Sequence, residues 1–138
     1  MRFLVDANVL SEPTKPAPSQ RVVEWLRANE LELAINPIVL GELRYGILLL
    51  PASRRRKRLQ EWFDEGVERL HVLDFDAQSA MVWADLLMRL KKKGLAMSVK
   101  DSLIAATALV HGLILATRNV GDFRAAGVRL FNPFGNTS

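Results

Sequence analysis

Short apolar runs in this chain alternate with longer stretches whose apolar residues recur every three or four positions. The short runs predict strands at residues 3–5, 31–35, 70–73, 113–116 and 128–131. Strands that alternate with helices form βαβ units, in which a helix packs back onto a parallel sheet. We therefore expect an α/β fold of three layers, α/β/α, with a central, mainly parallel sheet of about five strands.

The longer stretches predict helices whose apolar faces cover that sheet. Asp76 is a candidate N-cap for one of them, which Gly94 would end, and Ser98 opens the next, which runs to His111. In chain order, the residues expected to share a helical face are Val22, Trp25 and Leu26; Leu40, Leu43, Ile47 and Leu50; Leu59, Trp62, Phe63 and Val67; and Ala80, Trp83, Ala84, Leu87 and Leu90.

Composition limits the classes of protein to which the chain can belong. A chain of 138 residues that is 49% hydrophobic has the size of one domain, spanning 1–138. No apolar run approaches the roughly 20 residues that cross a bilayer, and the start of the chain lacks the apolar core of a signal peptide. With no cysteine for a disulfide or a thiolate metal site, the expected location is the cytoplasm.

The net charge of +4 favours a polyanionic partner such as nucleic acid. The basic block consists of Arg54, Arg55, Arg56, Lys57 and Arg58, and it precedes an amphipathic helix. These side chains are candidates for contact with RNA phosphates. The alternative is that they form the solvated first turn of that helix.

Acidic and amide side chains lie where predicted strands end or helices begin: Asp6, Glu42, Asp101, and the pair Asn119 and Asp122. Ligand sites of open α/β sheets lie outside the carboxyl ends of the strands. Taken singly, each acid can have a purely structural role instead of binding a ligand. Asp6 can close a turn, Glu42 can be a solvated helix residue, and Asp101 can form a capping box with Ser98. Together, however, several carboxylates in one cleft repel each other unless a cation is bound.

The donor atoms indicate which cation and which chemistry are expected. Hard oxygen ligands suit Mg²⁺ or Mn²⁺, and neither His71 nor His111 shows the spacing of a metal ligand. A divalent ion held by carboxylates can support hydrolysis of a phosphodiester. A nucleic-acid-binding module without catalysis and a phosphatase of small molecules are the alternatives; the second lacks a glycine-rich phosphate loop.

Four ordered segments of the chain, residues 4–12, 39–46, 99–108 and 115–119 with the later Asn132-Pro133-Phe134, together resemble a PIN domain. More narrowly, they are similar to the VapC and FitB type of toxin ribonuclease. The resemblance spans the whole chain and implies a PIN-like fold and a Mg²⁺- or Mn²⁺-dependent endoribonuclease.

The resemblance also implies the positions of the site. It maps the acidic site onto Asp6, Glu42 and Asp101, with Asn119 at the fourth and more variable position, where many relatives carry aspartate. We expect Asp6 and Asp101 to be direct metal ligands and Glu42 to be a ligand or to orient the attacking water. Asn119 is the favoured fourth group, and Asp122 is peripheral.

Three macromolecular partners follow from the same resemblance. These are an RNA substrate, a small DNA-binding antitoxin that directs an arginine towards the acidic site, and a second copy of the chain. Apolar side chains in short helices, including Trp25, Leu48, Leu49 and Trp62, outnumber what one small core can absorb, which also favours a homodimer.

Overall fold

The computed structural model describes residues 1–135 and contains one sheet of five strands, all parallel, in the order β3-β2-β1-β4-β5. The predicted α/β fold is confirmed, and residues 136–138 of the predicted single domain lie outside the described residues. The strands are β1 (Phe3–Val5), β2 (Leu33–Ile35), β3 (His71–Val72), β4 (Ile114–Ala116) and β5 (Leu130–Phe131).

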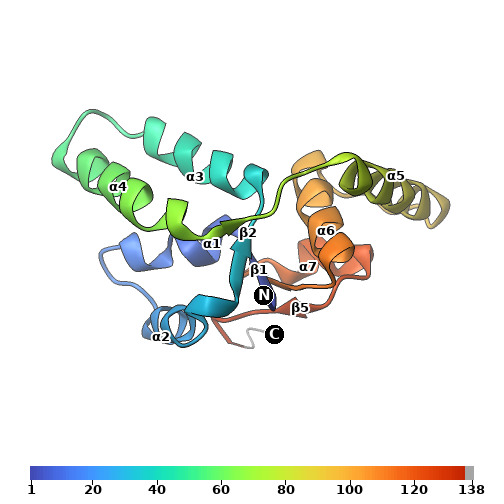
Figure 1. Cartoon of the computed structure of the whole chain (residues 1–138), viewed down its shortest axis with the longest axis horizontal. Helices are drawn as coiled ribbons and strands as arrows, with labels where there is room; N and C mark the ends of the chain where they lie inside the picture. Colours follow the sequence, from blue (N-terminus) through green and yellow to red (C-terminus); the bar gives the residue numbers. More distant parts are fainter. Residues whose placement is uncertain (136–138) are drawn as a thin grey trace.

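Helices connect the strands, and two pairs of them, α3 with α4 and α5 with α6, rise as separate lobes beyond the sheet (Figure 1). The α-helices are α1 (Ala7–Leu10), α2 (Gln20–Ala28), α3 (Pro37–Leu48), α4 (Arg54–Glu65), α5 (Ala77–Lys92), α6 (Val99–His111) and α7 (Val120–Phe123). Short 3₁₀ helices are η1 (Glu12–Thr14), η2 (Glu30–Glu32), η3 (Val67–Arg69) and η4 (Arg124–Ala126).

The centre of the sheet is fully apolar, which is why its strands read as continuous hydrophobic runs. Leu4 of β1 pairs in register with Ala34 of β2 and Leu115 of β4, and all three side chains are completely buried. Strand order reverses between β1 and β4, because the chain adds strands to one side of β1 first and then to the other. A ligand site is therefore expected outside the ends of these two strands.

The helix boundaries confirm the predicted capping residues. Asp76 accepts a hydrogen bond from the backbone N–H of Ser79, and Ser98 accepts one from that of Asp101. Gly94, with φ of +67°, follows the end of α5, in a backbone conformation that L side chains rarely adopt. Within residues 1–135, no helix combines the length and the apolar character needed to cross a membrane.

Four of the five predicted strands were too long, the one at 113–116 by a single residue, since β4 begins at Ile114. The run at 31–35 starts with Leu31, but this residue lies in η2 with its side chain 94% exposed, and β2 begins only at Leu33. The backbone N–H of Glu32 donates to the carbonyl of Asn29, and this turn keeps Leu31 out of the sheet. Strands β3 and β5 are two residues each, because only these positions pair with their inner neighbours.

Two predictions about apolar side chains were also wrong. In α5, Leu86 is fully buried whereas Leu87 is 36% exposed, because this helix packs mainly against α6 and η4. Trp25 does not form a free surface for a second copy. Its ring packs against Phe3 at 4.9 Å and Phe131 at 5.4 Å between centroids, closing one end of the core.

Candidate active site

Asp6 is a buried carboxylate at the carboxyl end of β1, with only 6% of the residue exposed. One oxygen, Oδ1, accepts a hydrogen bond from the backbone N–H of Ala7 at 2.8 Å, so Asp6 caps the short helix α1. The other oxygen, Oδ2, accepts the hydroxyl hydrogen of Thr117 at 2.8 Å. Asp6 therefore does close a turn, as its structural interpretation predicts. Its second oxygen, however, binds Thr117, which follows a different strand, β4.

Thr117 follows β4 directly and is a positioning residue that sequence analysis missed. Its fully buried hydroxyl donates to Asp6 and accepts the backbone N–H of Asn119 at 3.1 Å, which fixes the direction of the donated hydrogen. Asn8 also donates to Oδ2 of Asp6, at 3.3 Å. A polar residue after a buried strand at the switch point of the sheet was the available signal for Thr117.

Glu42 reaches the same region from the second turn of α3. Asn36 caps this helix through Val39 and donates to Thr107 of α6 at 3.3 Å, so α3 is anchored to α6 by buried polar groups. Oε2 of Glu42 forms an ion pair with Nζ of Lys100 at 3.1 Å. Its other oxygen, Oε1, is buried and has no hydrogen-bond partner among the described residues. Glu42 is thus not a freely solvated helix residue.

Asp101 occupies the first turn of α6, where Ser98 supplies the cap. The hydroxyl oxygen of Ser98 accepts the backbone N–H of Asp101 at 3.1 Å. Among the hydrogen bonds of residues 1–135, none ends on the Asp101 carboxylate, so the reciprocal half of a capping box is not formed. The carboxylate is half-exposed and free to bind a ligand.

Lys100, the residue before Asp101, pairs with Glu42, so the start of α6 lies against α3. The charge of Asp101 acts on the pKa of both Asp6 and Glu42. Burial raises the pKa of Asp6; the hydrogen bonds from Thr117 and Ala7 oppose this rise, and the charge of Asp101 adds to it. Burial likewise raises the pKa of Glu42, only partly offset by Lys100, with the charges of Asp6 and Asp101 contributing to the rise. Glu42 in turn raises the pKa of Lys100. Asp6 and Glu42 therefore resist ionisation unless a cation is nearby.

The donor chemistry of this cluster fits a hard divalent cation. Asp6, Glu42 and Asp101 offer carboxylate oxygens, one of them, Oε1 of Glu42, buried and unsatisfied. A cationic group, Lys100, already lies against Glu42. The side chains are not closed around an ion, since residues 1–135 contain no group of three or more histidine, aspartate or glutamate side chains in a ligand-like arrangement.

The fourth position lies at the end of the same strand as Thr117. Asn119 is exposed, and its backbone N–H is tied to Thr117, which places it at the rim beside Asp6. Its side chain makes no capping hydrogen bond to α7. Asp122 is exposed one turn further along, in α7.

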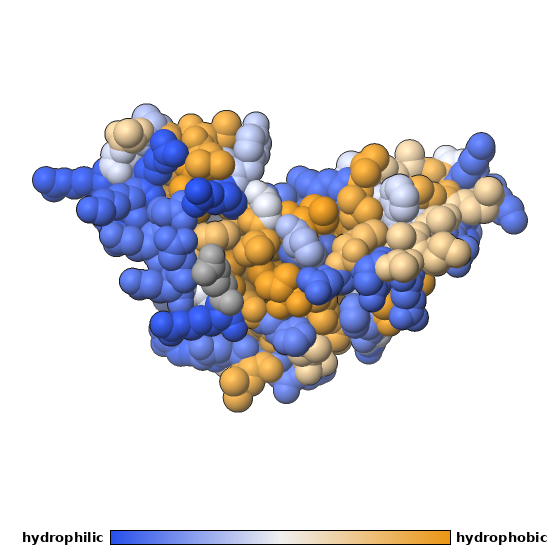
Figure 2. Space-filling model, turned by 45° about the horizontal axis from the view of Figure 1, so that its top comes forward, coloured by the Kyte–Doolittle hydropathy of each residue, from blue (hydrophilic) through white to orange (hydrophobic). Residues whose placement is uncertain are grey.

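A hollow extends from the acidic cluster between α1, η1, α3 and α4. It measures about 210 Å³ and is lined by Asn8, Thr14, Glu42, Leu59 and Trp62, among others. Figure 2 shows the face of the molecule that is hollowed between its two lobes, with hydrophobic side chains at the base and hydrophilic ones along the outer edges. Of the three acids, Glu42 lines this hollow, so the acidic cluster opens into it on the α3 side.

The basic block forms the first turns of α4, after the cap Ser53, whose hydroxyl oxygen accepts the backbone N–H of Arg56. The five side chains do not share one environment. Arg55 and Arg58 line a hollow towards η1, whereas Arg56 and Lys57 line another beside the carboxyl end of α3.

The family model, the related sequences and the related structures all point to the same protein family. The sequence matches the PIN domain over residues 3–128. Toxin FitB from Neisseria gonorrhoeae is 38% identical over 136 residues, covering 96% of this chain and 98% of its own. VapC ribonuclease Y4jK from Sinorhizobium fredii is 37% identical, covering 96% and 97%. The crystal structure of FitAcB from Neisseria gonorrhoeae has a TM-score of 0.90 at 38% identity, covering 97% of this chain and 99% of that chain.

Proposed function

The chain belongs to the PIN-domain family, and from that premise we propose that it is the metal-dependent endoribonuclease toxin of a toxin–antitoxin pair. The relatives named a toxin and a ribonuclease support this, since the chain matches each over nearly its whole length. The observation that carries the proposal is the buried Asp6 carboxylate, which the fold holds beside Glu42 and Asp101 although burial and like charge raise its pKa.

The proposed metal is Mg²⁺ or Mn²⁺, held by Asp6, Asp101 and Glu42, with Asn119 as a weaker fourth group. When bound, this ion supplies compensation for the charge that develops on the phosphoryl oxygens and makes water a better nucleophile. Asp6 is pre-oriented by Thr117, so the chain loses little entropy in ordering it. Glu42 keeps one oxygen unsatisfied and has a raised pKa, which suits a group that orients water and accepts its proton.

The test is cleavage of purified total RNA by the wild-type chain and by Asp6→Asn, with Mg²⁺, with Mn²⁺ and with a chelator. We expect new RNA ends only with the wild-type chain and a metal. Sequencing those ends identifies the target. RNA binding without cleavage by the wild-type chain would instead support a non-catalytic nucleic-acid-binding module.

An antitoxin is the second element of the proposal. An acidic cluster suits a cationic side chain, and the pairing of Lys100 with Glu42 shows that an ammonium group is accepted there. We expect a small DNA-binding antitoxin to lay a segment in the groove and to direct an arginine towards Asp6, Glu42 and Asp101. We expect the toxin to act on RNA in the cytoplasm, where the bound antitoxin inhibits cleavage.

Co-expression with the neighbouring small open reading frame, followed by pull-down and a cleavage assay, tests this element. Binding of the partner should remove metal-dependent cleavage. If the partner binds and cleavage continues at the rate of the free chain, occlusion of the active site is wrong.

We also propose that the chain forms a homodimer, with an interface that does not include Trp25. Exposed apolar side chains remain at the carboxyl end of α3, where Tyr45 is 64%, Leu48 47% and Leu49 65% exposed. A surface of this kind is typical of an interface. Light scattering at micromolar concentration should give twice the chain mass, and Leu49→Asp should shift it towards the mass of one chain. A monomeric wild-type chain would contradict the dimer.

A further inference from the structure

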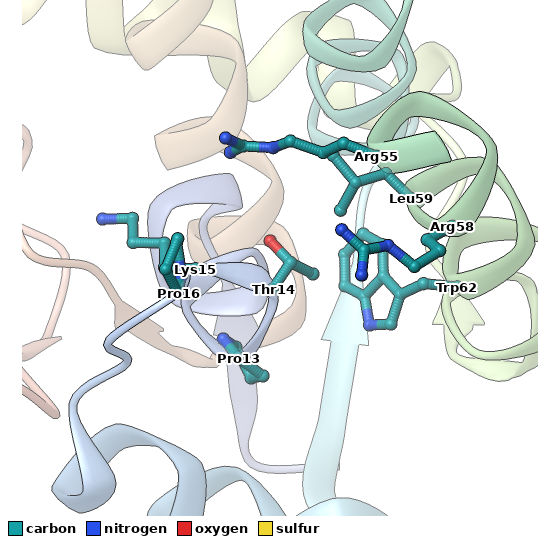
Figure 3. A pocket seen from close by; sticks show the side chains of 8 residues that line it. All are labelled: Pro13, Thr14, Lys15, Pro16, Arg55, Arg58, Leu59 and Trp62. Atoms are coloured by element: carbon teal, nitrogen blue, oxygen red, sulfur yellow. The ribbon is translucent and has the colours of Figure 1, made fainter. Parts of the chain in front are cut away.

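A second hollow beside the acidic groove is not lined by any of the acids. It measures about 510 Å³ and lies between η1 and the first turns of α4. Figure 3 shows Arg55, Arg58 and Trp62 on the α4 side, facing Thr14 across the gap, while the Lys15 side chain extends away from α4. A volume of this size is typical of a pocket for a small organic group.

This pocket and the hollow beside the acids form one groove, because they share residues. Thr14, Leu59 and Trp62 line both of them. Glu42 and Asn8 lie at the other end of the smaller hollow. A chain that crosses the acidic cluster can therefore continue into the larger pocket.

The electrostatics of the pocket favour an anion. Lys15 is already neutralised, since its Nζ lies 2.9 Å from Oε1 of the buried Glu12. Burial raises the pKa of Glu12, but the hydrogen bonds from Lys15 and Ser19 outweigh it, so the net pKa is lowered and the pair stays charged. Arg55 and Arg58, in contrast, form no ion pair with any side chain that the structure describes.

Helix stability does not explain these two arginines. The amino end of a helix carries partial positive charge and disfavours cations, and like charges three or four residues apart repel each other. Arg55 and Arg58 lie three apart at the start of α4, whose first turn contains no acid to offset them. An external anion would supply the missing partner.

Trp62 adds an aromatic wall to the anion site. It lies one turn after Arg58 on α4, it is half-buried, and it faces both hollows. The opposite wall contains Pro13 and Pro16, whose fixed backbone angles limit its movement. An aromatic face beside unpaired guanidinium groups is the arrangement that binds a base and its phosphate in single-stranded nucleic acid.

We propose that this pocket is a subsite for one nucleotide of the RNA, adjacent to the phosphodiester that is cut. The base stacks on Trp62, and the phosphate is bound by Arg55 and Arg58. Arg54 and Lys57 contribute only general attraction, because neither lines this pocket. The subsite rests on the proposed ribonuclease function and defines which part of the basic block selects single-stranded RNA.

Binding of a fluorescein-labelled, single-stranded 12-nucleotide RNA tests the subsite directly. Fluorescence anisotropy is measured on the full chain carrying Asp6→Asn, in chelator, so that cleavage does not interfere. The double variant Arg55→Gln/Arg58→Gln is compared with the matched control Arg54→Gln/Lys57→Gln, which removes the same charge from the same helix. We expect the slope of log affinity against log salt to flatten by about 0.7 in the first variant, the value for one phosphate that is no longer neutralised. The control should change the slope by less than half of that.

The aromatic wall has its own pair of variants. Trp62→Leu should weaken binding by about tenfold, as expected when one base no longer stacks, whereas Trp62→Phe should retain most of the affinity. Thermal melting of every variant confirms that it is folded, and Trp62→Phe keeps the test valid if Trp62→Leu does not fold. Equal affinity of the chain for the RNA and for the same backbone without bases would contradict stacking.

The remaining outcomes separate the subsite from the ribonuclease function. If the chain with Asp6 intact cleaves RNA while both double variants weaken RNA binding equally, the subsite is wrong and the function stands. If the variants bind RNA normally but no longer bind the antitoxin, the pocket belongs to the protein partner, and the subsite is overturned. Absence of any metal-dependent cleavage by the wild-type chain would overturn the function itself.

Discussion

The acidic cluster and the basic start of α4 lie on the same groove but are built in opposite ways. Asp6 is buried, fixed by Thr117 and Ala7, and located by two central strands. The arginines of α4 have long, mostly exposed side chains, whose directions depend only on their positions around that one helix. Because the buried Asp6 is costly to ionise without a cation, we propose that the acids determine the chemistry and that the exposed basic block affects only binding strength.

The largest effect should follow removal of one charge from the acidic cluster. Asp101→Asn should reduce RNA cleavage by more than about 100-fold, since even outer partners of metal ligands affect metal affinity or activity by 10–100-fold. Asp122→Asn is the matched control in an exposed position and should retain most activity. Initial rates on total RNA with Mn²⁺ measure both. Full activity of folded Asp101→Asn would remove the metal-site proposal.

A smaller decrease is expected when Asp6 keeps its charge but is no longer oriented. Thr117→Val removes the hydroxyl that donates to Asp6 at 2.8 Å and should lower Mn²⁺ affinity and cleavage by roughly 10–100-fold. Thr117→Ser keeps the hydroxyl and should restore both. If the serine variant is as impaired as the valine variant, packing of the methyl group and not the hydrogen bond is responsible.

Removing the positive charge of Lys100 from the acidic cluster should strengthen metal binding, the opposite of the two effects above. Lys100→Met removes the ion pair with Glu42 at 3.1 Å and leaves more negative charge for a metal. Mn²⁺ affinity should rise, by no more than about fivefold, because exposed ion pairs contribute about 1 kcal/mol or less. Lys100→Arg should remain close to the wild type. Weaker Mn²⁺ binding by Lys100→Met would show that the lysine supports the site and does not compete with the ion.

The smallest effect concerns stability without metal. The raised pKa values of Asp6 and Glu42 mean that the folded chain binds more protons than the unfolded chain, so their contribution to stability falls as pH rises above about 4. Asp6→Asn removes the carboxylate whose charge is disfavoured by burial in the folded chain. In chelator, its melting temperature should exceed that of the wild type by a margin that grows from pH 4 to pH 7. A margin independent of pH would contradict this coupling.

Much of the scaffold could be predicted from sequence because it depends on central, fully buried strands. Leu4 and Leu115 lie in runs that have no other stable location, and the residues that follow these strands, Asp6 and Thr117, must meet at one edge of the sheet. Edge positions were less predictable. Leu31 is as apolar as its neighbours, but a local turn removes it from the sheet, and composition does not record that turn.

The site itself was predicted as a set of acids but not as a network. The sequence places Glu42 on a helix, but it does not show that Lys100 of α6, distant along the chain, pairs with it. It marks the basic block as one unit, whereas the helix turns Arg55 and Arg58 to one hollow and Arg56 and Lys57 to another. Contacts between distant segments, and the direction in which each side chain of a helix points, can be known only once the fold is known.

Titration of the chain with Mn²⁺, followed by electron paramagnetic resonance of the free ion, tests the acidic centre most directly. The wild-type chain should remove Mn²⁺ from the free pool, and Asp6→Asn, Glu42→Gln and Asp101→Asn should each weaken that binding while melting as folded proteins. Equal Mn²⁺ binding by the wild type and all three variants, or no binding by the wild type at millimolar Mn²⁺, would contradict a metal centre formed by these carboxylates.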